Sequence, residues 1–263
     1  MKRGIILFSL ICLCACSKET ASVLLRAGIA PSTKSYAGEK SADTFPLCWS
    51  EGDVISVNGC LSAPLGEAFD GRSEAEFRVE GESLTAPYQL LYPASAGLSS
   101  QLTFDGVLPP MYASGDALSE PFEFHQASFG IRFSISGDMP LNSITLEAPG
   151  GESLTGSFTL SFSDGSLTPL SGNALFTKDF ASPEDISQTK TYTFFFSPGT
   201  FSEGIILRAD SPYGQSRRWL FASGRELVRG KMYCLPELSF VRKPGIIYVG
   251  LEEMTETEVP FEL

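Results

Sequence analysis

The sequence predicts an all-β protein, and three observations support that prediction. Short apolar stretches recur along the chain at regular spacing, with turn residues between them. The composition favours strands and turns, with 25 Gly, 17 Pro and 20 Phe among 263 residues. No stretch shows a sustained helical period, and residues 182–187 allow at most one helical turn. Short strands at this spacing are typical of β-sandwiches, and the chain is long enough for two of them.

In the first half, short strands closed by turns are expected. Residues 54–57 have a strand pattern between the turn Gly52-Asp53 and the hairpin signal Asn58-Gly59. The pair Pro109-Pro110 interrupts the pattern, because proline cannot donate to a strand ladder. Further strands are expected at residues 75–79, 88–92, 102–104 and 122–125.

The second half contains the clearest period-two pattern. Phe129, Ile131, Phe133 and Ile135 alternate with small or polar residues, which indicates a half-buried strand. Turn pairs such as Asp164-Gly165 separate the later strands. Those strands are expected at residues 143–147, 155–161, 192–196, 205–209, 217–221 and 231–235.

A change of composition between residues 109 and 127 divides the chain into two sandwiches of about 100 residues each, a usual domain size. The predicted organisation is a lipoprotein signal peptide at 1–16, an exposed propeptide or linker at 17–44, an N-terminal β-sandwich at 45–121, a C-terminal β-sandwich at 122–240 and an acidic tail at 241–263.

The first sixteen residues predict export. Lys2 and Arg3 precede an apolar run that is too short to span a bilayer. Leu13 and Ala15 then stand at the positions that a lipoprotein signal peptidase prefers, directly before Cys16. We therefore expect lipidation of Cys16 and attachment to the outer membrane. The alternative is an ordinary secretory signal in which this cysteine is incidental.

The charge argues against nucleic-acid partners. The chain carries a net charge of −12, and removal of the leader with Lys2 and Arg3 brings it to −14, from 31 acidic and 17 basic residues. Such a chain has no basic stripe that could displace phosphate counterions. Anionic membrane surfaces would also repel it, so attachment to a membrane must come from the lipid.

No catalytic, cofactor or metal site is predicted. His125 is the only histidine, its context is a strand, and no nucleophile motif accompanies it. Trp49 and Trp219 are expected in the core, with sugar-stacking platforms as the alternative.

The cysteines of the body lack metal-site spacing. Cys48, Cys60 and Cys234 could form at most one disulfide, in one of three pairings. Buried free thiols are the simpler expectation. None of the three has the C-x-x-C spacing of redox or zinc sites.

Five motifs together resemble the fimbrillin-like (Mfa-like) pilus subunits of Gram-negative anaerobes, and they occur in the expected order over about residues 45–240. They are Trp49-Ser50-Glu51-Gly52-Asp53-Val54-Ile55-Ser56-Val57, Leu91-Tyr92-Pro93-Ala94, the run from Phe124 to Phe133, Leu154-Thr155-Gly156 and Gly230-Lys231-Met232-Tyr233.

The resemblance implies two tandem transthyretin-like β-sandwiches with Greek-key type topology, and a role as a structural or accessory subunit of a cell-surface fimbria that supports adhesion. It also implies assembly by strand exchange with other fimbrial subunits, after an arginine-specific protease removes an N-terminal strand. Residues 23–26 resemble such a segment, with Arg26 as the candidate cleavage point, and residues 246–263 resemble a donor strand.

Alternative interpretations of Arg26, of the C-terminal tail and of the function stay open at this point. Arg26 could be an ordinary linker residue, and the tail could be an edge strand of its own sandwich, because strand addition and edge pairing look alike in sequence. The chain could also be a monomeric outer-membrane surface lipoprotein that binds a glycan or a host ligand, and a hydrolase is disfavoured by the lone histidine.

Overall fold

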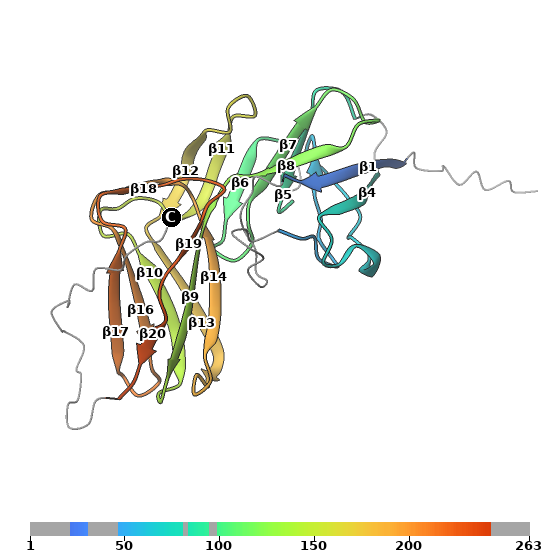
Figure 1. Cartoon of the computed structure of the whole chain (residues 1–263). Helices are drawn as coiled ribbons and strands as arrows, with labels where there is room; N and C mark the ends of the chain where they lie inside the picture. The colour runs from blue at the N-terminus through green and yellow to red at the C-terminus, as the bar shows by residue number, and fades with distance from the viewer. Residues whose placement is uncertain (1–21, 31–46, 81–83, 95–98, 243–263) are drawn as a thin grey trace, which may run out of the picture.

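A computed structural model describes residues 22–30, 47–80, 84–94 and 99–242 of the chain (Figure 1). Within these ranges the protein is built from β-strands and a single short 3₁₀ helix, which confirms the all-β prediction. No helix in this part of the chain is long and apolar enough to cross a membrane. The leader with Cys16 and the acidic tail from residue 243 lie outside the described residues.

The elements in chain order are β1 (Ser22–Ile29), β2 (Ser56–Val57), β3 (Cys60–Leu61), η1 (Glu67–Phe69), β4 (Glu74–Glu80), β5 (Tyr88–Tyr92), β6 (Gln101–Phe104), β7 (Met111–Gly115), β8 (Phe122–Gln126), β9 (Phe129–Gly137), β10 (Leu141–Glu147), β11 (Thr155–Leu160), β12 (Leu167–Asn173), β13 (Leu175–Glu184), β14 (Lys190–Phe196), β15 (Gly199–Phe201), β16 (Ile205–Asp210), β17 (Ser216–Phe221), β18 (Arg225–Leu227), β19 (Met232–Cys234) and β20 (Leu238–Phe240).

The N-terminal half forms a seven-stranded sheet in the order β3-β2-β5-β7-β8-β1-β4. Its two ends approach each other, because Ser62, next to β3, forms a bridge with Val79 of β4. The Ala63 amide also donates to the Arg78 carbonyl at 2.7 Å. The sheet therefore curls around its own hydrophobic core.

Trp49 lies at the centre of the N-terminal core and is 1% exposed. The rings of Phe77, Tyr92 and Phe124 meet its indole edge to face, at centroid distances of 5.0, 5.5 and 5.3 Å. Such pairs add to the free energy gained by burying aromatic surface. The expectation that Trp49 packs in the core is confirmed.

Two of the sequence motifs meet in this core. The Tyr92 hydroxyl donates to Asp53 Oδ1 at 2.8 Å, and the Ser50 amide donates to Asp53 Oδ2 at 2.7 Å. Gly52 has a φ of +86°, a conformation that glycine adopts without strain. Burial raises the pKa of Asp53 despite these two hydrogen bonds. The motif residues around Trp49 and Tyr92 thus fix a turn and hold it to the core.

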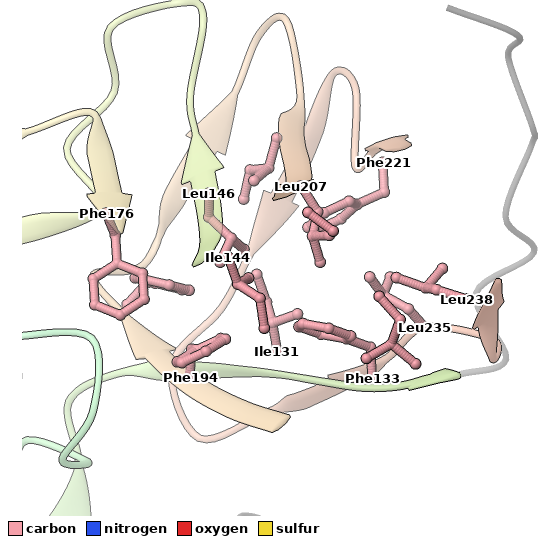
Figure 2. Close-up of a cluster of buried hydrophobic side chains, with 14 of the residues drawn as sticks. Ile131, Phe133, Ile144, Leu146, Phe176, Phe194, Leu207, Phe221, Leu235 and Leu238 are labelled. Atoms are coloured by element: carbon pink, nitrogen blue, oxygen red, sulfur yellow. The ribbon is translucent and has the colours of Figure 1, made fainter. Parts of the chain in front are cut away.

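The C-terminal half contains two sheets that face each other in a sandwich-like arrangement. One has the order β13-β10-β16-β17, and the other has β14-β9-β19, with β20 also paired to β9. Figure 2 shows side chains from both sheets pointing into a shared core. Ile131 and Phe133 of β9, predicted from the period-two pattern, are at most 1% exposed there.

A smaller sheet, β12-β11-β6, connects the two halves of the sequence. Strand β6 comes from the first half and pairs with β11 of the second over residues 101–104 and 156–159. Beside it, Leu91, Phe104 and Phe158 belong to a third, smaller hydrophobic cluster. The two halves of the sequence are thus joined by strand pairing in this sheet.

The predicted boundary between residues 121 and 122 makes β8 the first strand of the second sandwich, and this is wrong. Strand β8 pairs with β7 and β1, within the seven-stranded sheet. Phe122 and Phe124 are buried in the same core as Trp49. The alternating pattern correctly indicates a strand, but alternation alone does not say which core its apolar face covers.

Candidate functional site at the N-terminal strand

Strand β1 is inserted between two strands that are distant from it in sequence (Figure 1). It runs antiparallel to β4 over residues 22–28 and parallel to β8 over residues 27–29. The prediction of an exposed propeptide or linker at 17–44 therefore does not hold for residues 22–29. Their alternating apolar side chains give them a buried face, which a small and polar connection would lack.

The buried face of β1 consists of Leu25, Ala27 and Ile29, which are 0%, 2% and 9% exposed. Leu24 lies on the opposite face and is 55% exposed. Full burial of one leucine side chain stabilises a fold by about 1.5–3 kcal/mol. The strand is thus held to the core by a few apolar side chains and by its backbone pairing.

Arg26 lies on the outer face of β1. Its side chain is 74% exposed, and its Nε atom lies 3.6 Å from Glu76 Oε1 on β4. A pair this open to solvent contributes little to stability. The structure thus brings the candidate cleavage residue to the surface, on a strand whose neighbouring side chains are buried. Cleavage at Arg26 itself stays a prediction.

A hollow of about 1270 Å³ adjoins the C-terminal half of β1. Among the described residues, its walls come from β1, β4, β8 and the segment around Phe69. They include Leu47 and Phe69 as well as charged residues such as Arg72 and Glu123. This mixture of apolar and charged side chains forms no catalytic arrangement among the described lining residues.

The other residues singled out in the sequence are scattered. His125 is exposed on β8, as an ordinary strand histidine would be, with its ring centroid 5.9 Å from that of Tyr112. Trp219 is half-buried against the C-terminal core, and the Arg217 guanidinium lies 5.8 Å from its ring centroid. Among the described residues, no group of His, Cys, Asp or Glu is arranged to hold a metal ion.

The cysteine expectation is partly wrong. Within the described part of the chain no disulfide joins Cys48, Cys60 and Cys234. Cys60 and Cys234 are exposed, however, and Cys48 is only half-buried. Burial raises the pKa of the Cys48 thiol above its ordinary value, with a further contribution from the nearby Asp70 carboxylate.

Sequence reasoning found Arg26 and the short apolar run around it, but not the place of β1 between β4 and β8. That placement joins strands about fifty and one hundred residues apart along the chain, and no local pattern encodes it. The alternation of Leu25, Ala27 and Ile29 is the one sequence signal that could have indicated a strand there.

Comparison with known proteins supports the fold. No protein-family model matches the chain, and no curated protein matches it. A putative cell adhesion protein from Bacteroides ovatus superposes with a TM-score of 0.51 at 13% identity, covering 82% of this chain and 92% of that chain. One from Bacteroides fragilis superposes with a TM-score of 0.51 at 11% identity, covering 89% and 98%.

A looser superposition involves the tip fimbrial protein Mfa3 from Porphyromonas gingivalis, with a TM-score of 0.39 at 11% identity, covering 92% of this chain and 98% of that chain. The conclusion about fold rests on the two tighter superpositions, which extend over most of both chains. This chain therefore shares the fold of solved Bacteroides proteins that are described as putative cell adhesion proteins.

Proposed function

We propose that this chain is a structural or accessory subunit of a cell-surface fimbria, that it polymerises by strand exchange and that it supports adhesion rather than catalysis. The observation that carries the proposal is the position of β1. It is an N-terminal strand between β4 and β8, with Leu25 buried and Arg26 exposed. The fold shared with the Bacteroides proteins is consistent with this function.

The physical logic of exchange follows from what β1 covers. Without it, backbone groups of β4 lose their partners and the pocket of Leu25 opens to water. A strand from another subunit that adds apolar side chains and backbone hydrogen bonds would satisfy both. An enclosed core with a replaceable strand thus supplies a driving force for polymerisation.

The route to the surface is part of the same proposal. Lipid on Cys16 carries the precursor to the outer membrane, an arginine-specific protease cuts after Arg26, and residues 246–263 of a neighbouring subunit supply the donor strand. Cys16 and the donor segment lie outside the described residues. We also propose that the two main cores belong to tandem transthyretin-like domains, with the boundary after β8 rather than before it.

Deletion of residues 246–263 is expected to leave a folded monomer that no longer joins a polymer, because the donor strand would be missing while both described cores stay complete. Size-exclusion chromatography and electron microscopy would follow assembly, and urea unfolding would follow stability. A full-length variant with Glu252→Gln and Glu253→Gln serves as the control for the lost charge. If the truncated chain unfolds instead, the tail belongs to its own sandwich and the donor assignment is wrong.

A monomeric surface lipoprotein that binds a glycan is the second candidate, and Trp219 is the observation that favours it. Its ring is only half-buried, and it lies beside Arg217 within β17, paired with Leu207 of β16. Calorimetric titration of the purified monomer against a glycan panel would test this. Binding that is lost in Trp219→Ala and kept in Arg78→Ala would favour this candidate over the fimbrial subunit.

A further inference from the structure

We propose that β1 consists of two halves that separate at the bond between Arg26 and Ala27. Residues 22–26 leave the sheet of the folded protein and return, while residues 27–29 stay in place. This half-strand opening rests on the strand-exchange function proposed above and names the part of β1 that is exchanged. It also explains how a protease reaches Arg26 without unfolding the whole protein.

Strand pairing differs between the two halves. Residues 27–29 pair with β4 or the residues before it on one side and with β8 on the other, and the Ile29 amide donates to the Ser73 carbonyl at 3.0 Å. The Ala30 amide continues this pattern by donating to the Phe124 carbonyl at 2.9 Å. Residues 22–26 pair with β4 alone among the strands that the structure describes.

The pairing between β1 and β8 ends at Pro121. The parallel register joins Ala27 to Phe122, so Pro121 is next in line, opposite Arg26. The Ala30 amide donates to the Phe124 carbonyl, and backbone polar groups alternate sides along a strand, so Pro121 turns its nitrogen away from β1. Strand β8 begins directly after this proline, which leaves residues 22–26 with β4 as their one partner among the described strands.

The N-terminal half of β1 is also less buried than the C-terminal half. In residues 22–26 only Leu25 is fully buried, with Val23 half-buried beside the core. The shorter segment 27–29 contains two buried side chains, Ala27 and Ile29. A segment with fewer strand partners and fewer buried side chains opens locally at a lower free energy than the rest of the fold. Residues 22–26 are therefore expected to open more readily than residues 27–29. Detachment of residues 22–26 exposes the side chain of Leu25 and part of that of Val23. Loss of the full strand also exposes the side chains of Ala27 and Ile29 and breaks the pairing with β8.

The opened half-strand makes the cleavage chemistry possible. Hydrolysis breaks the bond between the Arg26 carbonyl carbon and the Ala27 nitrogen. Water supplies the hydroxyl of the new Arg26 carboxyl group and a proton to the new Ala27 amine. Loss of residues 22–26 then frees the backbone of β4 over residues 76–80 together with the Leu25 pocket, while residues 27–29 keep β4 and β8 joined.

Amide hydrogen exchange and limited trypsin digestion of the folded chain test the opening directly. We expect the amides of residues 22–26 to exchange at least about tenfold faster than those of residues 27–30, and trypsin to cut at Arg26 before it cuts at Arg78 of the paired strand β4. Leu25→Ala removes the one fully buried side chain of residues 22–26, so their exchange and the cleavage at Arg26 should both become at least about tenfold faster, while residues 27–30 exchange as in the wild type. Pro212→Ala, at an exposed turn between β16 and β17, should change neither.

Two results would overturn the inference. One is exchange of residues 22–30 at a single rate, and the other is cleavage at Arg26 that is unaffected by Leu25→Ala in a folded variant. If that variant fails to fold, Val23→Ala decides instead, since Val23 is half-buried against the core and its truncation should speed exchange of residues 22–26 and leave residues 27–30 unchanged. A chain that opens and is cut at Arg26 but never polymerises would retain the half-strand opening and refute the fimbrial function.

Discussion

Replacement of Arg26 by lysine is expected to abolish maturation of the exported chain and to prevent its incorporation into a polymer. An arginine-specific protease would no longer recognise the site. Lysine keeps a positive charge near Glu76, and the native pair is largely exposed at 3.6 Å, so the fold should keep its stability. Immunoblotting of membrane and shed-polymer fractions would show the full-length precursor accumulating in the membrane.

Arg78→Ala provides the matched control. Arg78 is exposed on the neighbouring strand β4, opposite Leu24, and its loss should leave maturation intact. Normal assembly of the Arg26→Lys chain, with the same mature N-terminus as wild type, would rule out cleavage at this residue. The protein would then be better described as an anchor or as a stand-alone surface lipoprotein.

The largest effect on stability is expected from Trp49→Ala, which should lower the free energy of unfolding by about 3–5 kcal/mol. The indole is 1% exposed and contacts the rings of Phe77, Tyr92 and Phe124, so its removal leaves a cavity in the centre of the N-terminal core. Urea unfolding followed by circular dichroism would measure the loss.

Two further substitutions control this prediction. Trp49→Phe should cost much less, because the Nε1 atom of Trp49 is buried with no hydrogen-bond partner among the described residues, and phenylalanine removes that unpaired donor. Trp219→Ala should also cost less, since its ring is only half-buried. Equal losses for Trp49→Ala and Trp219→Ala would contradict the central role given to Trp49.

The sequence predicted the strands whose side chains alternate strongly. The pattern of Phe129 to Ile135 gave β9 and its buried face, and the turn at Gly52-Asp53 lies where it was expected. It missed β7, whose sequence Met111-Tyr112-Ala113-Ser114-Gly115 does not alternate because its first three residues are all buried. It also missed β12 and most of β13, whose side chains are largely exposed and show no apolar period.

Local sequence patterns could not predict which strands pair with each other or which core each strand covers. The alternation at Phe122 and Phe124 indicates a strand but not its neighbours, so β8 was assigned to the wrong core. The same limit applies to the candidate site, since Arg26 could be singled out by its type and position, whereas its place beside β4 depends on pairing across fifty residues. The exposure of Cys60 and Cys234 likewise follows from tertiary packing, which overrides the average tendency of cysteine to be buried.

Mass spectrometry of the N-terminus of the assembled, surface-displayed protein tests the central claim most directly. The claim is that β1 is cut at Arg26 so that a neighbouring subunit can replace its N-terminal half. The expected result is a chain that begins at Ala27, without lipid, in the polymer. Polymers whose subunits keep residues 22–26 and carry lipid on Cys16 would contradict it.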